Sequence, residues 1–269
     1  MAHTKGVYQS TGRDGGFNQF IFLVTSLVLR EFKGQYRRAF LGPIWALIKP
    51  IGYMMVFIFL RGVFDIKSDG APFALFTFCA LVPWTFFNTA LSRCAPSVVS
   101  NGMILKKADI PREIFPIATV GIALFDLLIS MIVLVGMLVW YEAPAFGWNL
   151  IWLPILILLT GLMALGMGFG AALIATVRRD IVFAMPFMMQ FWMLASPVMY
   201  PLSQVPERWH SIVVINPMVG IIEGFRNVLI HGKAPDMDLL SVSIIVTVVV
   251  WVVFLPLYHQ MSKYFSDVL

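Results

Sequence analysis

Long apolar segments, separated by short polar or charged stretches, recur along this sequence. Six of them approach or exceed the roughly 20 mostly apolar residues that a helix needs to cross a bilayer. Those six segments are residues 42–64, 72–91, 114–141, 150–177, 181–200 and 239–259. The second, fourth, fifth and sixth contain no Asp, Glu, Lys or Arg. The pattern predicts an all-α protein with six transmembrane helices.

The overall composition agrees with lipid as the solvent. Of the 269 residues, 59% are apolar and 12% are charged, whereas a soluble domain has roughly 45–50% and about 25%. The formal net charge is +5. The basic residues lie between the apolar segments without a nucleic-acid-binding motif around them, so we expect no nucleic acid as a partner.

The distribution of Lys and Arg predicts the orientation of the chain. Basic residues collect before the first segment, between the second and third, and directly after the fourth, at Arg178 and Arg179. The alternate connections hold few: residues 65–71 contain one Lys, and residues 142–149 contain none. Because positively charged loops stay in the cytoplasm, both termini are predicted to be cytoplasmic.

A helix before the first span is predicted to lie along the cytoplasmic membrane surface. An apolar stretch from residue 17 to residue 28 runs into a basic one whose candidate residues are Arg30, Lys33, Tyr36, Arg37 and Arg38. Lys and Arg near anionic lipid and rings in the headgroup layer are typical of an interfacial amphipathic helix. The alternative is a solvated tail. We therefore divide the chain into residues 1–41, tail and interface helix, and a transmembrane domain of residues 42–269.

The connection before the last span, residues 201–238, is too long and too apolar for an ordinary loop. Pro217 after Asn216 interrupts its apolar run, and Glu223 and Arg226 are spaced to pair on one face of a helix. We expect a broken, partly re-entrant hairpin at the outer side, because irregular backbone at membrane depth must line a path or be covered by protein. These four residues are our candidates for an outer gate, with the ion pair buried.

Catalytic and metal-binding patterns are missing from the sequence. It contains no GxxxxGK[ST] phosphate loop, no HExxH among its four His residues and no GxSxG. The two Cys, Cys79 and Cys94, have neither disulfide nor CxxC spacing. We predict no catalytic residue, no metal site and no cofactor bound by this chain. Asp126, deep in the third segment, is either functional or hydrogen-bonded to a neighbouring helix.

The loop of residues 101–116 combines both charge signs with apolar residues and two prolines. A charged rim around apolar anchors suits docking onto another protein, whereas a plain connector would more simply be polar. The charged residues that are candidates for such docking are Lys106, Lys107, Asp109, Arg112 and Glu113.

Six stretches, in order, resemble a known family. They are Arg30-Glu-Phe-Lys33-Gly-Gln-Tyr36 with Leu41-Gly42-Pro-Ile-Trp45, residues 82–87, residues 101–116, Arg178-Arg179-Asp180, residues 196–201, and Asn216-Pro217 with Glu223-Gly-Phe-Arg226. On these motifs the chain resembles the transmembrane subunit of ABC-2 type exporters, in the branch that exports O-antigen, capsular polysaccharide and teichoic acid. The resemblance covers nearly the whole chain.

The resemblance implies a homodimer in the inner membrane that pairs with two separate ATPase subunits, which use ATP and Mg. It also implies that residues 101–116 contain the coupling helix that docks on the ATPase, and that the substrate is a lipid-linked polysaccharide. Sugars stack on aromatic rings, so rings in the spans are candidates for the translocation path. These candidates are Trp84, Phe86, Phe87, Phe191, Trp192 and Tyr200.

The leading hypothesis is therefore that the chain is the permease subunit of an ATP-driven exporter of lipid-linked polysaccharide, with O-antigen as the first candidate substrate. The alternatives within transport are a capsular polysaccharide or teichoic acid exporter, or another ABC-2 exporter of drugs or lipids. From a different class, a membrane-embedded glycan-processing enzyme would need a polar catalytic constellation near the membrane surface.

Overall fold

The structure is a computed structural model that describes residues 13–36, 40, 42–64, 66–107, 110–144, 147–263 and 265. Within these residues every regular element is helical, which confirms the predicted all-α class. The α-helices are α1 (Arg13–Tyr36), α2 (Trp45–Phe64), α3 (Phe73–Ser100), α4 (Gly102–Lys107), α5 (Ile114–Trp140), α6 (Trp152–Val177), α7 (Asp180–Ala195), α8 (Glu207–Val214), α9 (Pro217–Leu229) and α10 (Met237–Ser262). Short 3₁₀ turns, Gly42–Ile44, Trp148–Ile151 and Leu202–Gln204, precede α2, α6 and α8.

Five of these helices, α2, α3, α5, α6 and α10, are long and apolar enough to cross a membrane. The fifth predicted segment forms a shorter apolar helix, α7, which has 16 residues and therefore extends about 24 Å. It ends at Ala195 instead of residue 200, because Pro197 disfavours a helical conformation at the residue before it. Ser196 is accordingly extended.

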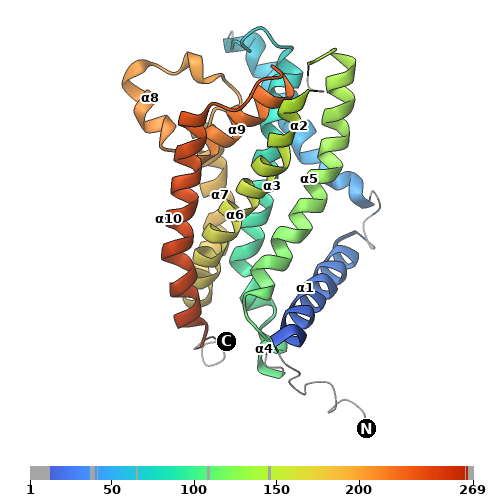
Figure 1. Cartoon of the computed structure of the whole chain (residues 1–269), viewed down its shortest axis with the longest axis vertical. Helices are drawn as coiled ribbons and strands as arrows, with labels where there is room; N and C mark the ends of the chain where they lie inside the picture. The colour runs from blue at the N-terminus through green and yellow to red at the C-terminus, as the bar shows by residue number, and fades with distance from the viewer. Residues whose placement is uncertain are drawn as a thin grey trace.

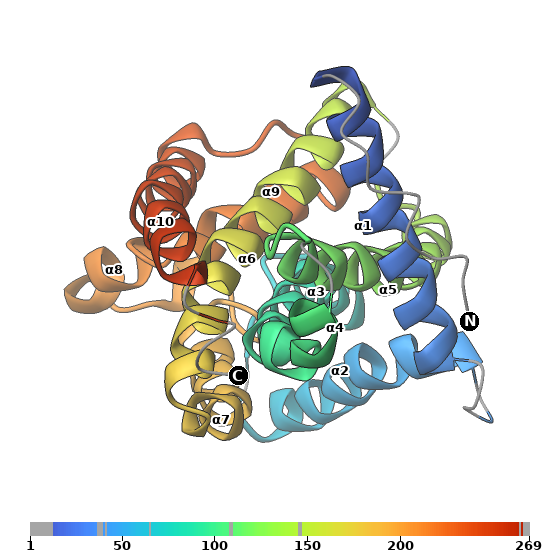
Figure 2. The same ribbon diagram turned by 90° about the horizontal axis from the view of Figure 1, so that it is seen from below.

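Helix α3 is the centre of the bundle. In the most apolar 18-residue stretch of α3, 78% of the residues are buried inside the subunit. The corresponding values are 11% for α2 and 17% for α10. Seen along the bundle, α2 and α7 lie on one side of α3, α1 and α5 on another, and α6 separates α3 from α10 (Figure 2). The outer surfaces of α2 and α10 are therefore left for lipid or for another protein.

The α3 helix is longer than the predicted second span. The prediction ended at residue 91, before Arg93, whereas the helix continues through Arg93 and Pro96 to Ser100. An Arg inside an apolar helix is accepted here because its Nη1 donates a hydrogen bond of 2.5 Å to the side-chain oxygen of Gln35 on α1.

Helices α6 and α10 pack closely because two glycines face large side chains. A Cβ atom on Gly166 would lie 2.8 Å from the ring of Trp251, and one on Gly170 would lie 2.7 Å from the ring of Phe254. Real Cβ atoms do not come this close to neighbours, so glycine is what lets the two helices approach.

The hairpin predicted before the last span is present and breaks at the predicted position. Helices α8 and α9 meet at an angle of 96°, with Asn216 between them as the N-cap of α9 and Pro217 as its first residue. This hairpin and α4 are at opposite ends of the bundle (Figure 1). We call these ends the hairpin end and the α4 end. The start of α1 and the end of α10 both lie at the α4 end.

Candidate functional site

The segment between α3 and α5, at the α4 end, is held at its first residue by α1. Its short helix α4 includes Lys106 and Lys107 as its last two residues, whereas Asp109 is outside the described residues. At the start of the segment, Nη2 of Arg30 on α1 donates a hydrogen bond of 2.9 Å to the side-chain oxygen of Asn101. This bond joins α1, the predicted interface helix, to the start of the segment that contains α4.

The other end of the same segment is held by α10. The hydroxyl of Tyr258, a fully buried residue, donates a hydrogen bond of 2.9 Å to the backbone oxygen of Arg112. Nδ1 of His259 lies 2.9 Å from a carboxylate oxygen of Glu113. The two ends of the segment that contains α4 are thus bonded to α1 and to α10, the first and last helices of the described chain.

The candidate residues of the interface helix are only partly within the described structure. Arg30 and Lys33 are exposed on α1, and Tyr36 is buried, while Arg37 and Arg38 lie outside the described residues. The hydroxyl of Tyr36 donates to the carboxylate of Asp126 on α5. Burial and this neighbouring carboxylate raise the pKa of Tyr36, so the phenol keeps its proton. Asp126 is therefore hydrogen-bonded to a neighbouring helix, α1, which is one of the two interpretations offered for it in the sequence analysis.

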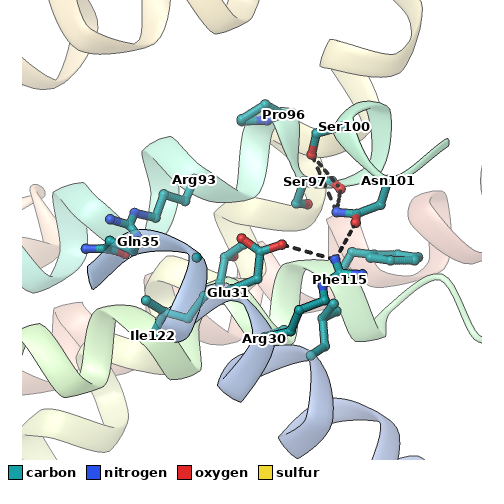
Figure 3. A pocket seen from close by; sticks show the side chains of 14 residues that line it. Arg30, Glu31, Gln35, Arg93, Pro96, Ser97, Ser100, Asn101, Phe115 and Ile122 are labelled. Carbon is teal, nitrogen blue, oxygen red and sulfur yellow. Dashed lines mark hydrogen bonds and ion pairs between the residues drawn. The ribbon is translucent and has the colours of Figure 1, made fainter. Parts of the chain in front are cut away.

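A cavity of about 550 Å³ is lined by residues of α1, α3 and α5. Figure 3 shows that Arg30, Glu31 and Gln35 point toward it from α1, and Arg93 and Ser97 from α3. Nη2 of Arg30 also lies 3.2 Å from the Glu31 carboxylate. This cavity combines a charged side with an apolar floor from α5.

Arg93 also contributes to two further cavities. One, of about 210 Å³, lies between the end of α1, α2, α3 and α5 and includes Lys49 and Asp126. The other, of about 620 Å³, lies between α2, α3 and α7; we call it the α2–α7 cleft. Its lining residues are Ile48, Lys49, Gly52, Tyr53, Val56, Asn88, Thr89, Ser92, Arg93, Pro186 and Gln190. Amides and hydroxyls at membrane depth make this cleft suited to a polar ligand.

The sequence analysis did not select Lys49 and Arg93, because both lie at or near the edges of apolar segments, where basic residues read as topology signals. The available signal was the position of Lys49 inside the first predicted span, four residues before Tyr53. Tyr53 and Gln190 form a polar pair in the wall of the same cleft. In that pair the Tyr53 hydroxyl donates a hydrogen bond of 3.2 Å to the Gln190 side-chain oxygen.

The aromatic path candidates fall into two groups. Trp84, Phe86 and Phe87 are at most 2% exposed and belong to the core of the subunit. Trp192 packs edge-on against Phe87, with ring centroids 5.1 Å apart. Trp84 and Phe87 are enclosed in the packing of α7 on α3, whereas Trp192 is partly exposed and Phe86 lines the cavity of about 210 Å³.

The two remaining candidates are accessible. Phe191 on α7 is 71% exposed. Tyr200 is half-buried beside a cleft of about 550 Å³ at the hairpin end, which it shares with Phe64 and Trp209. The structure therefore places these two rings, unlike Trp84 and Phe87, where a ligand or a second subunit reaches them.

At the hairpin end, the Glu223–Arg226 pair is formed and reaches across three elements. Nη1 of Arg226 lies 2.8 Å from a carboxylate oxygen of Glu223, and Nη2 donates a hydrogen bond of 3.0 Å to the backbone oxygen of Val198. The guanidinium also lies 3.6 Å from the ring centroid of Phe76 on α3. The Arg226 side chain is 1% exposed and that of Glu223 18%. The pair therefore fastens α9 to the core.

Asn216 joins the same hairpin to the end of α7. Its side-chain oxygen accepts hydrogen bonds from the Trp192 indole, at 3.0 Å, and from the backbone N–H of Met218, at 3.1 Å. Its amide donates a hydrogen bond of 2.8 Å to the Ser196 hydroxyl. Because every polar group of this side chain has a partner, the break before Pro217 has a defined geometry.

Comparison with known proteins identifies the family. Residues 23–230 match the family model described as ABC-2 type transporter. The chain belongs to the ABC-2 type transporter family. The match begins in α1 and extends through α9, so it includes the α2–α7 cleft, the α4 segment and the hairpin.

Relatives of this ABC-2 subunit match it over nearly their full length. It is 27% identical to the O-antigen export system permease protein RfbA of Myxococcus xanthus, over 87% of this chain and 90% of the relative. It is 20% identical to the O-antigen export permease of Klebsiella pneumoniae, over 92% and 95%. It is 23% identical to the polysialic acid transport protein KpsM of Escherichia coli, over 92% and 96%. This ABC-2 subunit is therefore a transporter permease, as the sequence motifs indicated.

Proposed function

We propose that this subunit is the permease of an ATP-driven exporter that moves lipid-linked polysaccharide from the cytoplasm across the inner membrane. The first candidate for this polysaccharide is an O-antigen. The supporting observation is the near full-length similarity to two O-antigen export permeases and to a polysialic acid transport protein. A separate ATPase subunit hydrolyses ATP with Mg, both termini are cytoplasmic, and the α4 end faces the ATPase.

The attachment of the α4 segment supports this role. A coupling element must pass a displacement from the ATPase to the spans. The segment has bonds to α1 through Asn101 and to α10 through Arg112 and Glu113, so a push on α4 acts on helices at both sides of the bundle. A plain connector would not need buried anchors such as Tyr258.

The translocation path in this proposal lies between two copies of the subunit, along the side where α2 and α7 lie together (Figure 2). The most apolar part of α2 is only 11% buried, so its surface is available to a second copy. The α2–α7 cleft offers Tyr53, Asn88 and Gln190 to sugar hydroxyls. Phe191 and Tyr200 remain as candidate stacking surfaces.

The test is export by the purified complex. The subunit is reconstituted in proteoliposomes with the ATPase encoded beside it, and the appearance of the lipid-linked glycan in the lumen of inside-out vesicles is followed after ATP addition. We expect transport that stops when the ATPase cannot hydrolyse ATP. Transport of a drug or a free lipid without the glycan would contradict the proposal, and so would processing of a lipid-linked sugar by the isolated subunit.

Capsular polysaccharide is the second candidate substrate, because a polysialic acid transport protein is 23% identical over 92% of this chain. Offering both glycan types to the same proteoliposomes separates the two candidates. The glycan made by glycosyltransferases encoded next to the subunit is expected to be the one transported.

A further inference from the structure

The α2–α7 cleft contains two cations and no counter-ion. Lys49 and Arg93 both line it, and of the described residues that line it none is acidic. Among the described residues no carboxylate lies within ion-pair distance of either cation. Arg93 has one side-chain partner, the neutral amide of Gln35. Asp126 faces both cations from the adjoining cavity of about 210 Å³ and accepts a hydrogen bond from Tyr36. Two cations thus share one carboxyl, which lies outside the cleft, and the cleft itself keeps an excess of positive charge.

Arg93 lies nearer the α4 end of the bundle than Lys49, because α2 begins about half-way along the bundle (Figure 1). Helix α3 has 28 residues and extends about 42 Å, which matches a hydrocarbon core with its two headgroup layers, about 40–45 Å. Arg93 is about 10 Å from the α4 end of α3, and Lys49 is about 6 Å along α2 from the first residue of that helix. A charge at the boundary of the hydrocarbon core is costly unless an opposite charge or water compensates it.

The two side chains differ in a way that suits a phosphate. Arg93 offers a planar fork that binds two phosphate oxygens together, and Lys49 offers a mobile point charge. Arg93 is half-buried and so held in place, whereas Lys49 is exposed at the rim. Both side chains line the same cavity, so a ligand inside it has both cations in its walls.

We propose that Lys49 and Arg93 bind the phosphate of a membrane lipid of the α4-side leaflet, with the headgroup inside the α2–α7 cleft. The inference rests on the proposed function, in which that lipid is the carrier of the glycan. The phosphate neutralises both cations, and the apolar chain lies against the exposed apolar surface of α2 and α7.

The polar groups above the cations extend the same site. Tyr53 follows Lys49 by one helical turn, and Asn88 precedes Arg93 by little more than one turn, so both lie about 6–8 Å farther toward the hairpin end. Gln190 lies opposite them and bonds Tyr53. That distance fits the first sugar attached to a phosphate, whose hydroxyls these side chains then contact.

The alternative is that both cations only mark the membrane surface, with Lys49 extended toward water. The two interpretations differ in what the removal of charge does. If the cations are surface markers, removing their charges changes the affinity for a lipid phosphate little. If they form a phosphate site, removing their charges abolishes most of that affinity.

Binding is measured on the complete complex in phosphatidylcholine nanodiscs, with polyprenyl diphosphate as the probe and unphosphorylated polyprenol as the comparison. The wild-type complex is expected to bind the diphosphate and not the alcohol. Arg93→Gln with Lys49→Gln is expected to weaken diphosphate binding at least 10-fold. Lys67→Gln, which removes an exposed charge at the hairpin end, is expected to leave it unchanged.

Phosphatidylglycerol added as a competitor distinguishes the two sources of phosphate. If it does not compete, the site takes the glycan carrier; if it competes equally and the double variant loses both ligands, the site takes phospholipid phosphate. The melting temperature of each variant and the charge-preserving Arg93→Lys separate binding from misfolding. Unchanged diphosphate binding by a folded double variant overturns the inference even if the wild type exports glycan. A wild type that binds the diphosphate but exports no glycan instead refutes the proposed function.

Discussion

Removing the carboxylate of Glu223 tests how the hairpin is fastened to the bundle. Arg226 has two hydrogen-bond acceptors, the Glu223 carboxylate at 2.8 Å and the Val198 backbone oxygen at 3.0 Å, and its side chain is 1% exposed. Glu223→Ala leaves this cation with a single acceptor and little access to water. Breaking a buried pair costs about 3–5 kcal/mol, and because Glu223 is partly exposed we expect the lower end.

Two further variants give an order that depends on this geometry. Glu223→Gln keeps an acceptor for Arg226 and exchanges a charged hydrogen bond for a neutral one, at about 1 kcal/mol. Arg226→Met keeps an apolar side chain over Phe76 but leaves the Val198 oxygen without a donor, at about 1–3 kcal/mol. The expected order of destabilisation is Glu223→Ala, then Arg226→Met, then Glu223→Gln.

Thermal unfolding in detergent, at one fixed heating rate, measures the order. For a chain of this size, each kcal/mol of lost stability lowers the melting temperature by about 2–4 °C. Glu223→Ala is therefore expected to melt about 6–12 °C lower than the parent. The control is Glu207→Gln on α8, an exposed acid of the same hairpin, for which we expect a change within about 0.5 kcal/mol. A loosened hairpin is also expected to leak ions in proteoliposomes.

A melting temperature of Glu223→Ala that equals that of Glu207→Gln would refute the reasoning. It would mean that Arg226 finds water or another acceptor once the carboxylate is gone, and that the pair contributes no more than an exposed one, under about 1 kcal/mol. Normal export without ion leak in all three variants would further show that the hairpin is not a gate.

Three other predictions concern the rest of the bundle. Tyr258→Phe removes the hydrogen bond to the Arg112 oxygen and should lower export per ATP hydrolysed. Gly220→Ala places a Cβ atom 2.2 Å from the backbone oxygen of Leu239, so we expect a lower melting temperature and a displaced α9. Single cysteines should be labelled only from the cytoplasm at position 107 and only from outside at position 145, in a Cys79- and Cys94-free background.

Each of these has its control. The control for Tyr258→Phe is Tyr141→Phe, because the Tyr141 hydroxyl forms no hydrogen bond among the described residues. This variant should leave coupling unchanged. An equal effect of both variants would remove Tyr258 from the coupling route. Gly62→Ala meets open space and should melt as the parent does. Labelling of position 107 from outside would reverse the predicted orientation.

The sequence alone predicted where most of the long apolar helices lie. The predicted spans of residues 42–64, 114–141 and 239–259 lie within three residues of the helices found. Lipid cannot hydrogen-bond a backbone, so a long apolar segment has to form a helix whatever its neighbours are. The break at Asn216 and Pro217 was predictable for a similarly local reason, because proline cannot continue a helix.

Only the tertiary structure decided which side of each helix faces protein. Trp84, Phe87 and Phe191 look alike in sequence, yet the first two are buried and the third is 71% exposed. In lipid the outer face of a helix is as apolar as its packed face, so no pattern separates them.

The polar contacts likewise depended on residues far apart in the chain. Arg93 stays within α3 because Gln35 reaches it from α1, and Arg226 is buried because Val198 supplies an acceptor and Phe76 a ring. A local pattern describes the backbone of one helix, whereas the environment of a buried charge is set by the partners that folding brings to it.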